Sequence, residues 1–324
     1  MAFSRAGSSV AQDQPCTART VMATVVDHDG NPVEGLQAAD FRGEFRGKGV
    51  QVLSATLDTS PRRIVLLLDA SGSIAASSVT WRAVKRIAEG MVRSVPPSNP
   101  VALMVFTDEI RSRVPFGQPR DYLTSRVAAL GKPDEWLGKR PGRTALFDAI
   151  MEALAELRPT QPGDIIYLIT DGGENASRHR PPEVKNALLT RGVRLFTLIV
   201  SGWLHPGSWT APPRERQLYG ERLREIAEVT GGCFFSLAPV DYSATEIMHD
   251  QPTSEERDSI LRRAEHIYQQ MGHYYRIEVK LPSAVDQPRG WKLEVVDERG
   301  KKRKGVELAY PRKLLPCDSG HRED

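Results

Sequence analysis

Four short apolar runs, each followed by polar or turn-forming residues, constrain the fold of this chain more than any other feature. They occupy residues 64–68, 101–106, 165–169 and 193–200. Runs of this length are typical of strands that are buried on both faces of a parallel sheet. Segments with helical spacing separate them, as in residues 79–95, where apolar side chains recur on one helix face. This alternation predicts an α/β fold, a doubly wound and mostly parallel sheet with helices on both faces.

Antiparallel β structure is expected on either side of this core in the sequence. Residues 20–57 contain β-rich runs around the turn formers of residues 27–32. After a helical pattern over residues 254–271, strand patterns return in residues 274–281 and 291–310. Either piece alone is too small to bury a core, so we expect the two to pack together as one small β domain.

These patterns divide the chain of 324 residues into five parts. The expected parts are a flexible tail (1–19), an N-terminal β segment (20–60), the α/β domain (61–240), a C-terminal helix and β segment that packs with 20–60 (241–315), and a second tail (316–324). The α/β part is long enough to bury a core of its own.

The charge balance gives no support to a nucleic-acid-binding function. The 44 basic and 41 acidic residues leave a net charge of +3, and the short basic run at residues 299–304 is typical of a solvated turn. No apolar run reaches the roughly 18 residues that a membrane-spanning helix needs. We therefore expect neither a nucleic-acid partner nor a membrane span.

Polar side chains follow the first and third apolar runs at the positions where a ligand of such a sheet would bind. An Asp-x-Ser-x-Ser turn, formed by Asp69, Ser71 and Ser73, follows the first run. Asp171 follows the third run, and Thr144 stands where a helix is expected to begin. Ligands of open α/β sheets bind outside the carboxyl ends of the strands, so we expect these side chains to meet there.

These five side chains offer only oxygen atoms, which favour a hard cation. Mg²⁺ is the first expectation, and Mn²⁺ and Ca²⁺ are the alternatives. Two carboxylates and three neutral hydroxyls leave the ion with residual positive charge. That charge can attract a carboxylate of a partner into an open coordination position.

The same residues resemble the metal-ion-dependent adhesion site of the von Willebrand factor A family, which includes the inserted domains of integrins. The resemblance covers most of the α/β domain. It implies that Ser71 and Ser73 bind the ion directly through their hydroxyls. It also implies that Thr144 binds directly or through water, and that Asp69 and Asp171 act mostly through water or hydroxyl hydrogen bonds.

Each residue of this set also has a simpler structural interpretation. Serine and aspartate are common in turns, and Thr144 could serve as a helix cap. The metal site is favoured because the fold would bring all five residues to one edge. Asp108 and Glu174 are expected near the same rim, as solvated loop charges rather than as metal contacts.

A looser resemblance concerns the segment before the α/β domain and the cellular location. Residues 25–41 resemble the leading part of bacterial VWFA-related secreted proteins, many of them from Acidobacteria. This implies a bacterial protein outside the cytoplasm, and residues 9–11 resemble the end of a signal peptide. Cys16 and Cys317 flank the expected folded region, and they either form a disulfide outside the cytosol or are free thiols.

We therefore expect a binding module and no enzyme. Its metal ion would hold an Asp or Glu of a protein partner, in adhesion or in complex assembly outside the cytoplasm. An intracellular adaptor for an ATPase is the alternative, and a hydrolase is a weaker one. A hydrolase would need a Gly-x-Ser-x-Gly elbow or a HExxH pair, and the sequence has neither. The loop of residues 202–217 is expected to be either a recognition surface or a packed lid.

Overall fold

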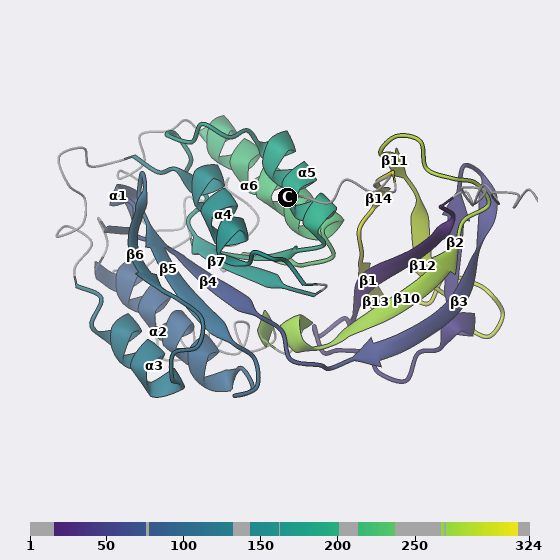
Figure 1. Cartoon of the computed structure of the whole chain (residues 1–324), viewed down its shortest axis with the longest axis horizontal. Coiled ribbons are helices and arrows are strands. Elements are labelled where there is room, and N and C mark those ends of the chain that lie inside the picture. The colour runs from purple at the N-terminus through teal and green to yellow at the C-terminus, as the bar shows by residue number, and fades with distance from the viewer. Residues whose placement is uncertain are drawn as a thin grey trace, which may run out of the picture.

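The protein, for which we have a computed structural model, consists of an α/β domain and a β domain that lie side by side (Figure 1). The structure describes residues 16–75, 78–131, 143–161, 163–200, 213–236, 267–268 and 270–316. Residues 1–15 and 317–324, and with them most of the two expected tails and Cys317, lie outside the described residues, and so do Trp203, Trp209 and most of the helical pattern expected over 254–271. Strand β1 already begins at Ala18, within the tail expected over residues 1–19.

The strands before and within the α/β domain are β1 (Ala18–Asp27), β2 (Phe41–Phe45), β3 (Lys48–Asp58), β4 (Ile64–Asp69), β5 (Val101–Phe106), β6 (Ile110–Val114), β7 (Ile165–Thr170), β8 (Arg194–Ile199) and β9 (Phe234–Ser236). Those after it are β10 (Tyr274–Lys280), β11 (Arg289–Gly290), β12 (Lys292–Val295), β13 (Val306–Ala309) and β14 (Lys313–Leu314). The helices are a 3-10 turn η1 (Ala38–Asp40), α1 (Gly72–Ala75), α2 (Ser78–Ser94), α3 (Arg120–Ala128), α4 (Leu146–Glu156), α5 (Pro181–Arg191) and α6 (Pro213–Val229).

The α/β domain is built on a six-stranded sheet in the order β6-β5-β4-β7-β8-β9. All neighbouring strands are parallel except β6, which pairs antiparallel with β5 at the edge. Every residue of β4, β5, β7 and β8 is buried, as the predominantly apolar runs predicted, and in β8 this includes Arg194 and Thr197. The doubly wound, mostly parallel sheet expected from the sequence is confirmed.

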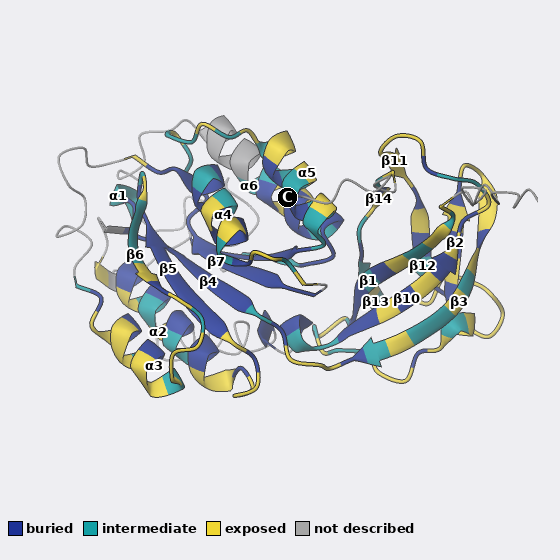
Figure 2. Cartoon of the chain, viewed as in Figure 1, coloured by how far each residue is buried: buried dark blue, intermediate teal, exposed yellow. Residues whose placement is uncertain are grey.

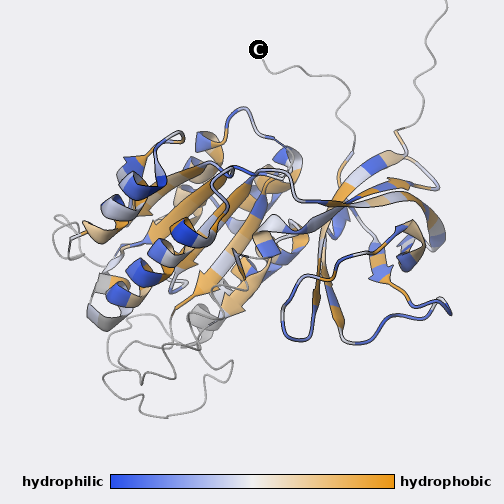
Figure 3. Ribbon diagram, turned by 90° about the horizontal axis from the view of Figure 1, so that it is seen from below, coloured by the Kyte–Doolittle hydropathy of each residue, from blue (hydrophilic) through white to orange (hydrophobic). Residues whose placement is uncertain are grey.

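Helices cover both faces of this sheet, and each face has its own apolar core (Figure 2). Trp81 of α2 and Leu123 of α3 belong to one core. Leu146 of α4, Leu188 of α5 and Ile226 of α6 belong to the other. Figure 3 shows the same layering, with hydrophobic strands enclosed by helices that carry hydrophilic outer faces. None of the described helices is both long and apolar enough to cross a membrane.

The β domain is formed by strands from both sides of the α/β domain in the sequence. Its six-stranded sheet has the order β12-β2-β3-β10-β1-β13, with antiparallel pairing throughout. In β10, Tyr275, Ile277 and Val279 are buried and alternate with exposed residues. They join Phe45 and Trp291 in a third core, which is separate from the two cores of the α/β domain.

Two arginines and a tyrosine form a buried joint between the domains. The guanidinium groups of Arg62 and Arg194 both contact the ring of Tyr274, at 4.8 and 4.3 Å from its centroid. Arg194 is fully buried and donates a hydrogen bond to the Met271 carbonyl at 3.0 Å, and burial lowers its pKa to about 10. Arg62 forms an ion pair with Asp58 at the end of β3. Desolvated cation–π contacts contribute about 2 kcal/mol or more each, so this joint ties the two domains together.

The prediction of a loop over residues 202–217 is wrong in part. Residues 213–217 belong to the start of α6, which begins at Pro213. Proline is tolerated in the first helical turn because the N–H that it lacks would have no partner there. The rest of the expected loop lies outside the described residues.

Candidate metal centre

Asp69 anchors the candidate site at the carboxyl end of the central strand β4. It is fully buried, and its two carboxylate oxygens contact two different segments of the chain. Oδ1 accepts a hydrogen bond from the Ser71 amide at 2.8 Å, and Oδ2 accepts one from the Thr170 hydroxyl at 2.6 Å. Asp69 therefore holds the turn after β4 against the end of the neighbouring strand β7.

Oxygens from three separate loops converge around Gly173. Asp171 Oδ1 accepts a hydrogen bond from the Gly173 amide at 2.9 Å. A Cβ atom built on Gly173 would lie 3.1 Å from Asp171 Oδ1 and 3.8 Å from each of Ser73 Oγ and Thr144 Oγ1. Ser71 Oγ is 3.2 Å from Ser73 Oγ, which adds the fourth side chain. The structure thus brings together Asp69, Ser71, Ser73, Thr144 and Asp171, the five residues singled out from the sequence.

Neither carboxylate of this cluster has a basic ion-pair partner among the described residues, and one of their oxygens has no hydrogen-bond partner there. Asp171 Oδ2 is buried and has no hydrogen-bond partner there. Burial and the charge of Asp171 raise the pKa of Asp69 to about 7, and burial also raises the pKa of Asp171. A buried carboxylate without a partner is costly unless a cation compensates it. An orphaned carboxylate oxygen among neutral hydroxyls fits a hard divalent ion.

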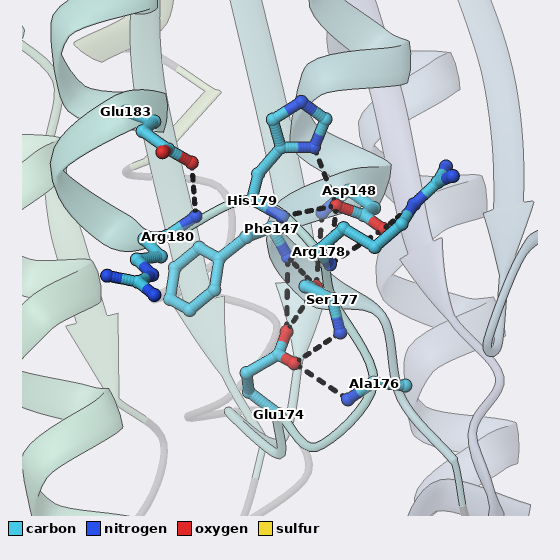
Figure 4. A network of polar contacts seen from close by, with 9 residues as sticks. All are labelled: Phe147, Asp148, Glu174, Ala176, Ser177, Arg178, His179, Arg180 and Glu183. Carbon is cyan, nitrogen blue, oxygen red and sulfur yellow. Dashed lines mark hydrogen bonds and ion pairs between the residues drawn. The ribbon is translucent and has the colours of Figure 1, made fainter.

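Glu174 and Ser177 fix the loop that follows Asp171 to the start of α4 (Figure 4). Glu174 Oε1 accepts hydrogen bonds from the amides of Ala176 and Ser177 at 2.9 and 2.8 Å. Its other oxygen accepts from the Ser177 hydroxyl at 2.6 Å, and that hydroxyl accepts from the Phe147 amide at 3.0 Å. Free amides at a helix start need such partners. Glu174 is a partly exposed loop charge, and beyond that expectation its side chain organises the loop.

Thr144 is held by the same loop through backbone contacts. Its amide donates to Asn175 Oδ1 at 2.9 Å, and its carbonyl accepts from the amides of Asn175 and Ala176, both at 3.1 Å. Asp148, in the first turn of α4, accepts from the backbone and the ring of His179, the latter at 2.7 Å (Figure 4). The loops that carry Thr144 and Asp171 therefore form one hydrogen-bonded unit.

The sequence analysis did not identify the supporting roles of Thr170, Glu174 and Ser177, and it placed Asp108 only near the rim of the site. Asp108 forms an ion pair with Arg111, so it is a paired loop charge. The role of Thr170 had a signal in the sequence, because it precedes Asp171 at the end of a buried strand. The roles of Glu174 and Ser177 had none, since both depend on contacts with Phe147, which is distant in the sequence.

The comparison with protein families agrees with this geometry. Residues 64–250, which are more than half of the chain, match the family model of the von Willebrand factor type A domain. The chain belongs to the von Willebrand factor type A domain family. Its α/β domain is therefore the A-type domain, and the Asp-x-Ser-x-Ser turn lies at the carboxyl end of the first strand of that domain. No curated protein matches the chain.

Several solved structures are similar to this chain at low identity. BatB from Bacteroides thetaiotaomicron is 20% identical, with 63% of this chain and 98% of that chain covered and a TM-score of 0.43. A von Willebrand factor type A protein from Catenulispora acidiphila is 12% identical, with 94% and 75% covered and a TM-score of 0.45. Proximal thread matrix protein 1 of the mussel byssus, solved with zinc in its MIDAS motif, is 16% identical, with 69% and 50% covered and a TM-score of 0.48.

Proposed function

We propose that the A-type domain binds a divalent ion, Mg²⁺ in the first place, and holds an acidic group of a protein partner through it. The observation that carries this proposal is the buried Asp171 Oδ2, which has no hydrogen-bond partner in the described part of the chain, beside three converging hydroxyls. The proposed ligand set is Asp69, Ser71, Ser73, Thr144 and Asp171.

Each residue of the set has a distinct proposed role. Ser71, Ser73 and Thr144 supply neutral hydroxyl oxygens. Asp69 already accepts hydrogen bonds through both carboxylate oxygens, so its role is to orient the turn and to balance charge. Asp171 offers the ion, or a water bound to it, the oxygen that no described residue contacts by a hydrogen bond. When bound, the ion supplies the positive charge that attracts the carboxylate of the partner.

We propose a binding module rather than an enzyme, acting in adhesion or in the assembly of complexes outside the cytoplasm. The proposed location is supported by Cys16, which is disulfide-bonded, since disulfides persist in oxidising compartments. Cys233 is a free thiol, and Cys317 lies outside the described residues. The alternative, an intracellular adaptor for an ATPase, would be favoured by finding Cys16 reduced in the native protein.

Thermal unfolding with and without Mg²⁺ tests the metal site. Ligand at about 100 times Kd stabilises the folded state by about 2.7 kcal/mol, which raises Tm by several degrees in a domain of this size. We expect this shift in the unchanged protein and its loss in Ser71→Ala. Asp29→Asn is the matched control, because Asp27, His28 and Asp29 form an exposed group that could also hold an ion. Equal shifts in the protein and in Ser71→Ala would contradict the proposal.

Partner capture tests the second half of the proposal. A partner retained on the immobilised protein in Mg²⁺ should dissociate in EDTA and should not bind Ser71→Ala. Retention that is insensitive to EDTA would mean that a different surface holds the partner.

A further inference from the structure

Arg143 directly precedes Thr144, which is one of the proposed ligands of the metal ion. Its side chain is exposed, whereas Thr144 and Ala145 are buried. Among the described residues, the Arg143 side chain has neither a hydrogen bond nor an ion pair. An arginine whose N–H donors are not engaged by the described part of the chain therefore adjoins the candidate metal centre.

The backbone next to Arg143 is fixed beside the other proposed ligands. The Thr144 amide, which shares a peptide unit with the Arg143 carbonyl, donates to Asn175 Oδ1 at 2.9 Å. The Ala145 amide donates to the Thr107 carbonyl at 2.8 Å. The Cα atoms of Arg143 and Thr144 are about 3.8 Å apart, as across any trans peptide. Because an arginine side chain is longer than this, Arg143 can reach a partner group bound to the ion without a change in the backbone.

Most other charged side chains on the loops around the centre already have partners. Glu174 accepts hydrogen bonds from two amides and from the Ser177 hydroxyl. The ion pairs of these loops join Asp108 and Glu109 to Arg111 and, as Figure 4 shows, Asp148 to Arg178 and His179. Arg180 is also exposed, but it lies at the start of α5 and adjoins no proposed ligand. Arg143 is therefore the arginine best placed to act on a partner together with the ion.

A guanidinium group beside a metal ion favours a carboxylate over a neutral ligand. The two cations repel each other, so Arg143 does not help the ion to bind by itself. A carboxylate offers two oxygens, and when the ion takes one of them the other can accept hydrogen bonds from the planar fork of the guanidinium. An amide or a hydroxyl brings no charge to balance the two cations. The pair of cations would therefore select Asp and Glu.

We propose that Arg143 is a specificity-determining residue, which binds the acidic side chain of the partner by donating to the carboxylate oxygen that the ion leaves free. This inference rests on the proposed function of the metal centre. It narrows the partner to a segment that exposes its Asp or Glu to two contacts at once, as a residue at the tip of a loop does.

Two short peptides, Ac-Gly-Asp-Gly-NH2 and Ac-Gly-Asn-Gly-NH2, serve as probes on the full chain loaded with Mg²⁺. Both ends are blocked, so the peptides differ only in one carboxylate. Titration of the nitrogen-15-labelled protein, followed by NMR, gives Kd and locates the binding. The Asp peptide should shift the amides of residues 144–147 at concentrations up to about 10 mM, and the Asn peptide should not.

A charge-neutral variant tests the residue itself. Arg143→Gln should weaken binding of the Asp peptide about tenfold or more. Its affinity for Mg²⁺ without peptide, measured by isothermal titration, should be unchanged or higher, because a neighbouring positive charge is removed. Arg299→Gln removes the same charge from an exposed arginine of the β domain, and it should leave the affinity for the peptide unchanged at constant ionic strength.

Two results would overturn this inference alone. One is equal affinity of Arg143→Gln and the unchanged protein for the Asp peptide. The other is loss of Mg²⁺ binding in Arg143→Gln, which would make Arg143 a support of the metal site. If the unchanged protein binds Mg²⁺ but not the Asp peptide, the partner half of the proposed function fails, and this inference fails with it. If the unchanged protein does not bind Mg²⁺, the metal site itself is refuted.

Discussion

Asp69 is the last residue of β4, and Asp171 directly follows the adjacent parallel strand β7. Both carboxyl groups are buried at the same edge of the sheet. Burial and the neighbouring charge raise the pKa of Asp69, and burial raises that of Asp171. Without a cation this pair is a local source of instability at neutral pH. The same repulsion is what would give a divalent ion its affinity.

The metal-free protein should lose stability as the pH rises. Because the pKa of Asp69 is raised to about 7, the folded state keeps its proton to a higher pH than the unfolded chain, where the value is near 4. The free energy of unfolding in EDTA should therefore fall between about pH 4 and pH 7. Urea titrations across this range measure it, and a rising free energy attributable to this pair would contradict the assignment.

Asp171→Asn should stabilise the metal-free protein and abolish its response to Mg²⁺. The amide keeps the shape of the side chain and removes one buried charge, so at pH 7.5 in EDTA we expect a gain of roughly 1–3 kcal/mol. Calorimetry with and without Mg²⁺ measures both effects. Asp29→Asn should show neither, and a destabilised Asp171→Asn protein that still responds to Mg²⁺ would be inconsistent with the site.

Glu174→Ala should weaken metal binding although Glu174 is not a proposed ligand. The change removes the acceptor for two loop amides and the Ser177 hydroxyl, which costs roughly 1–3 kcal/mol of stability. The loop that carries Asp171 then loses its fixed position against Thr144. Isothermal titration with Mg²⁺ should show a lower affinity, whereas Ser125→Ala, which removes a side-chain hydrogen bond on the exposed helix α3, should bind normally.

Asp58 should contribute to stability above about pH 4 and lose that contribution in acid. Burial would raise its pKa, but hydrogen bonds from Ser60 and the charge of Arg62 outweigh this and lower it to about 2. A group with a lowered folded pKa stabilises above its unfolded value, and the effect disappears as pH falls from about 4 to 2. Asp58→Asn should flatten the pH dependence of unfolding in that window. An unchanged slope would mean that Asp58 is not paired in solution.

The stacked joint should couple the unfolding of the two domains. Tyr274→Leu removes the ring that contacts both Arg62 and Arg194, so two calorimetric transitions should replace a single one. Tyr122→Leu, at an exposed tyrosine on α3, is the matched control and should leave one transition. A single transition in Tyr274→Leu would show that other contacts hold the domains together.

The sequence carried enough information for the fold class because β4, β5, β7 and β8 are predominantly apolar. It did not predict β2, whose residues Phe41–Phe45 are short, partly charged and interrupted by Gly43. That strand depends on tertiary contact: a Cβ on Gly43 would lie 2.8 Å from Val50 Cβ on β3, so only glycine fits between the strands.

The candidate site, like the fold, could be predicted from the sequence only in part. The five oxygen-bearing residues could be found because each follows a strand or precedes a helix, and the order of strands brings such positions together. Their role as metal ligands stays a prediction. The contacts of Glu174 with Phe147 could not be found, because nothing local in the sequence indicates which distant amides a loop carboxylate will reach.

The pairing of β1 with β10 and β13 has a consequence for biosynthesis. During synthesis β1 emerges before the whole A-type domain, and its neighbours in the sheet emerge after it. The early strands therefore keep an apolar face uncovered until β10 and β13 are synthesised, whereas the A-type domain can already complete its own sheet. Ribosome-bound chains that stop before residue 274 should contain a folded A-type domain and an unpaired β1, which is a natural target for a chaperone.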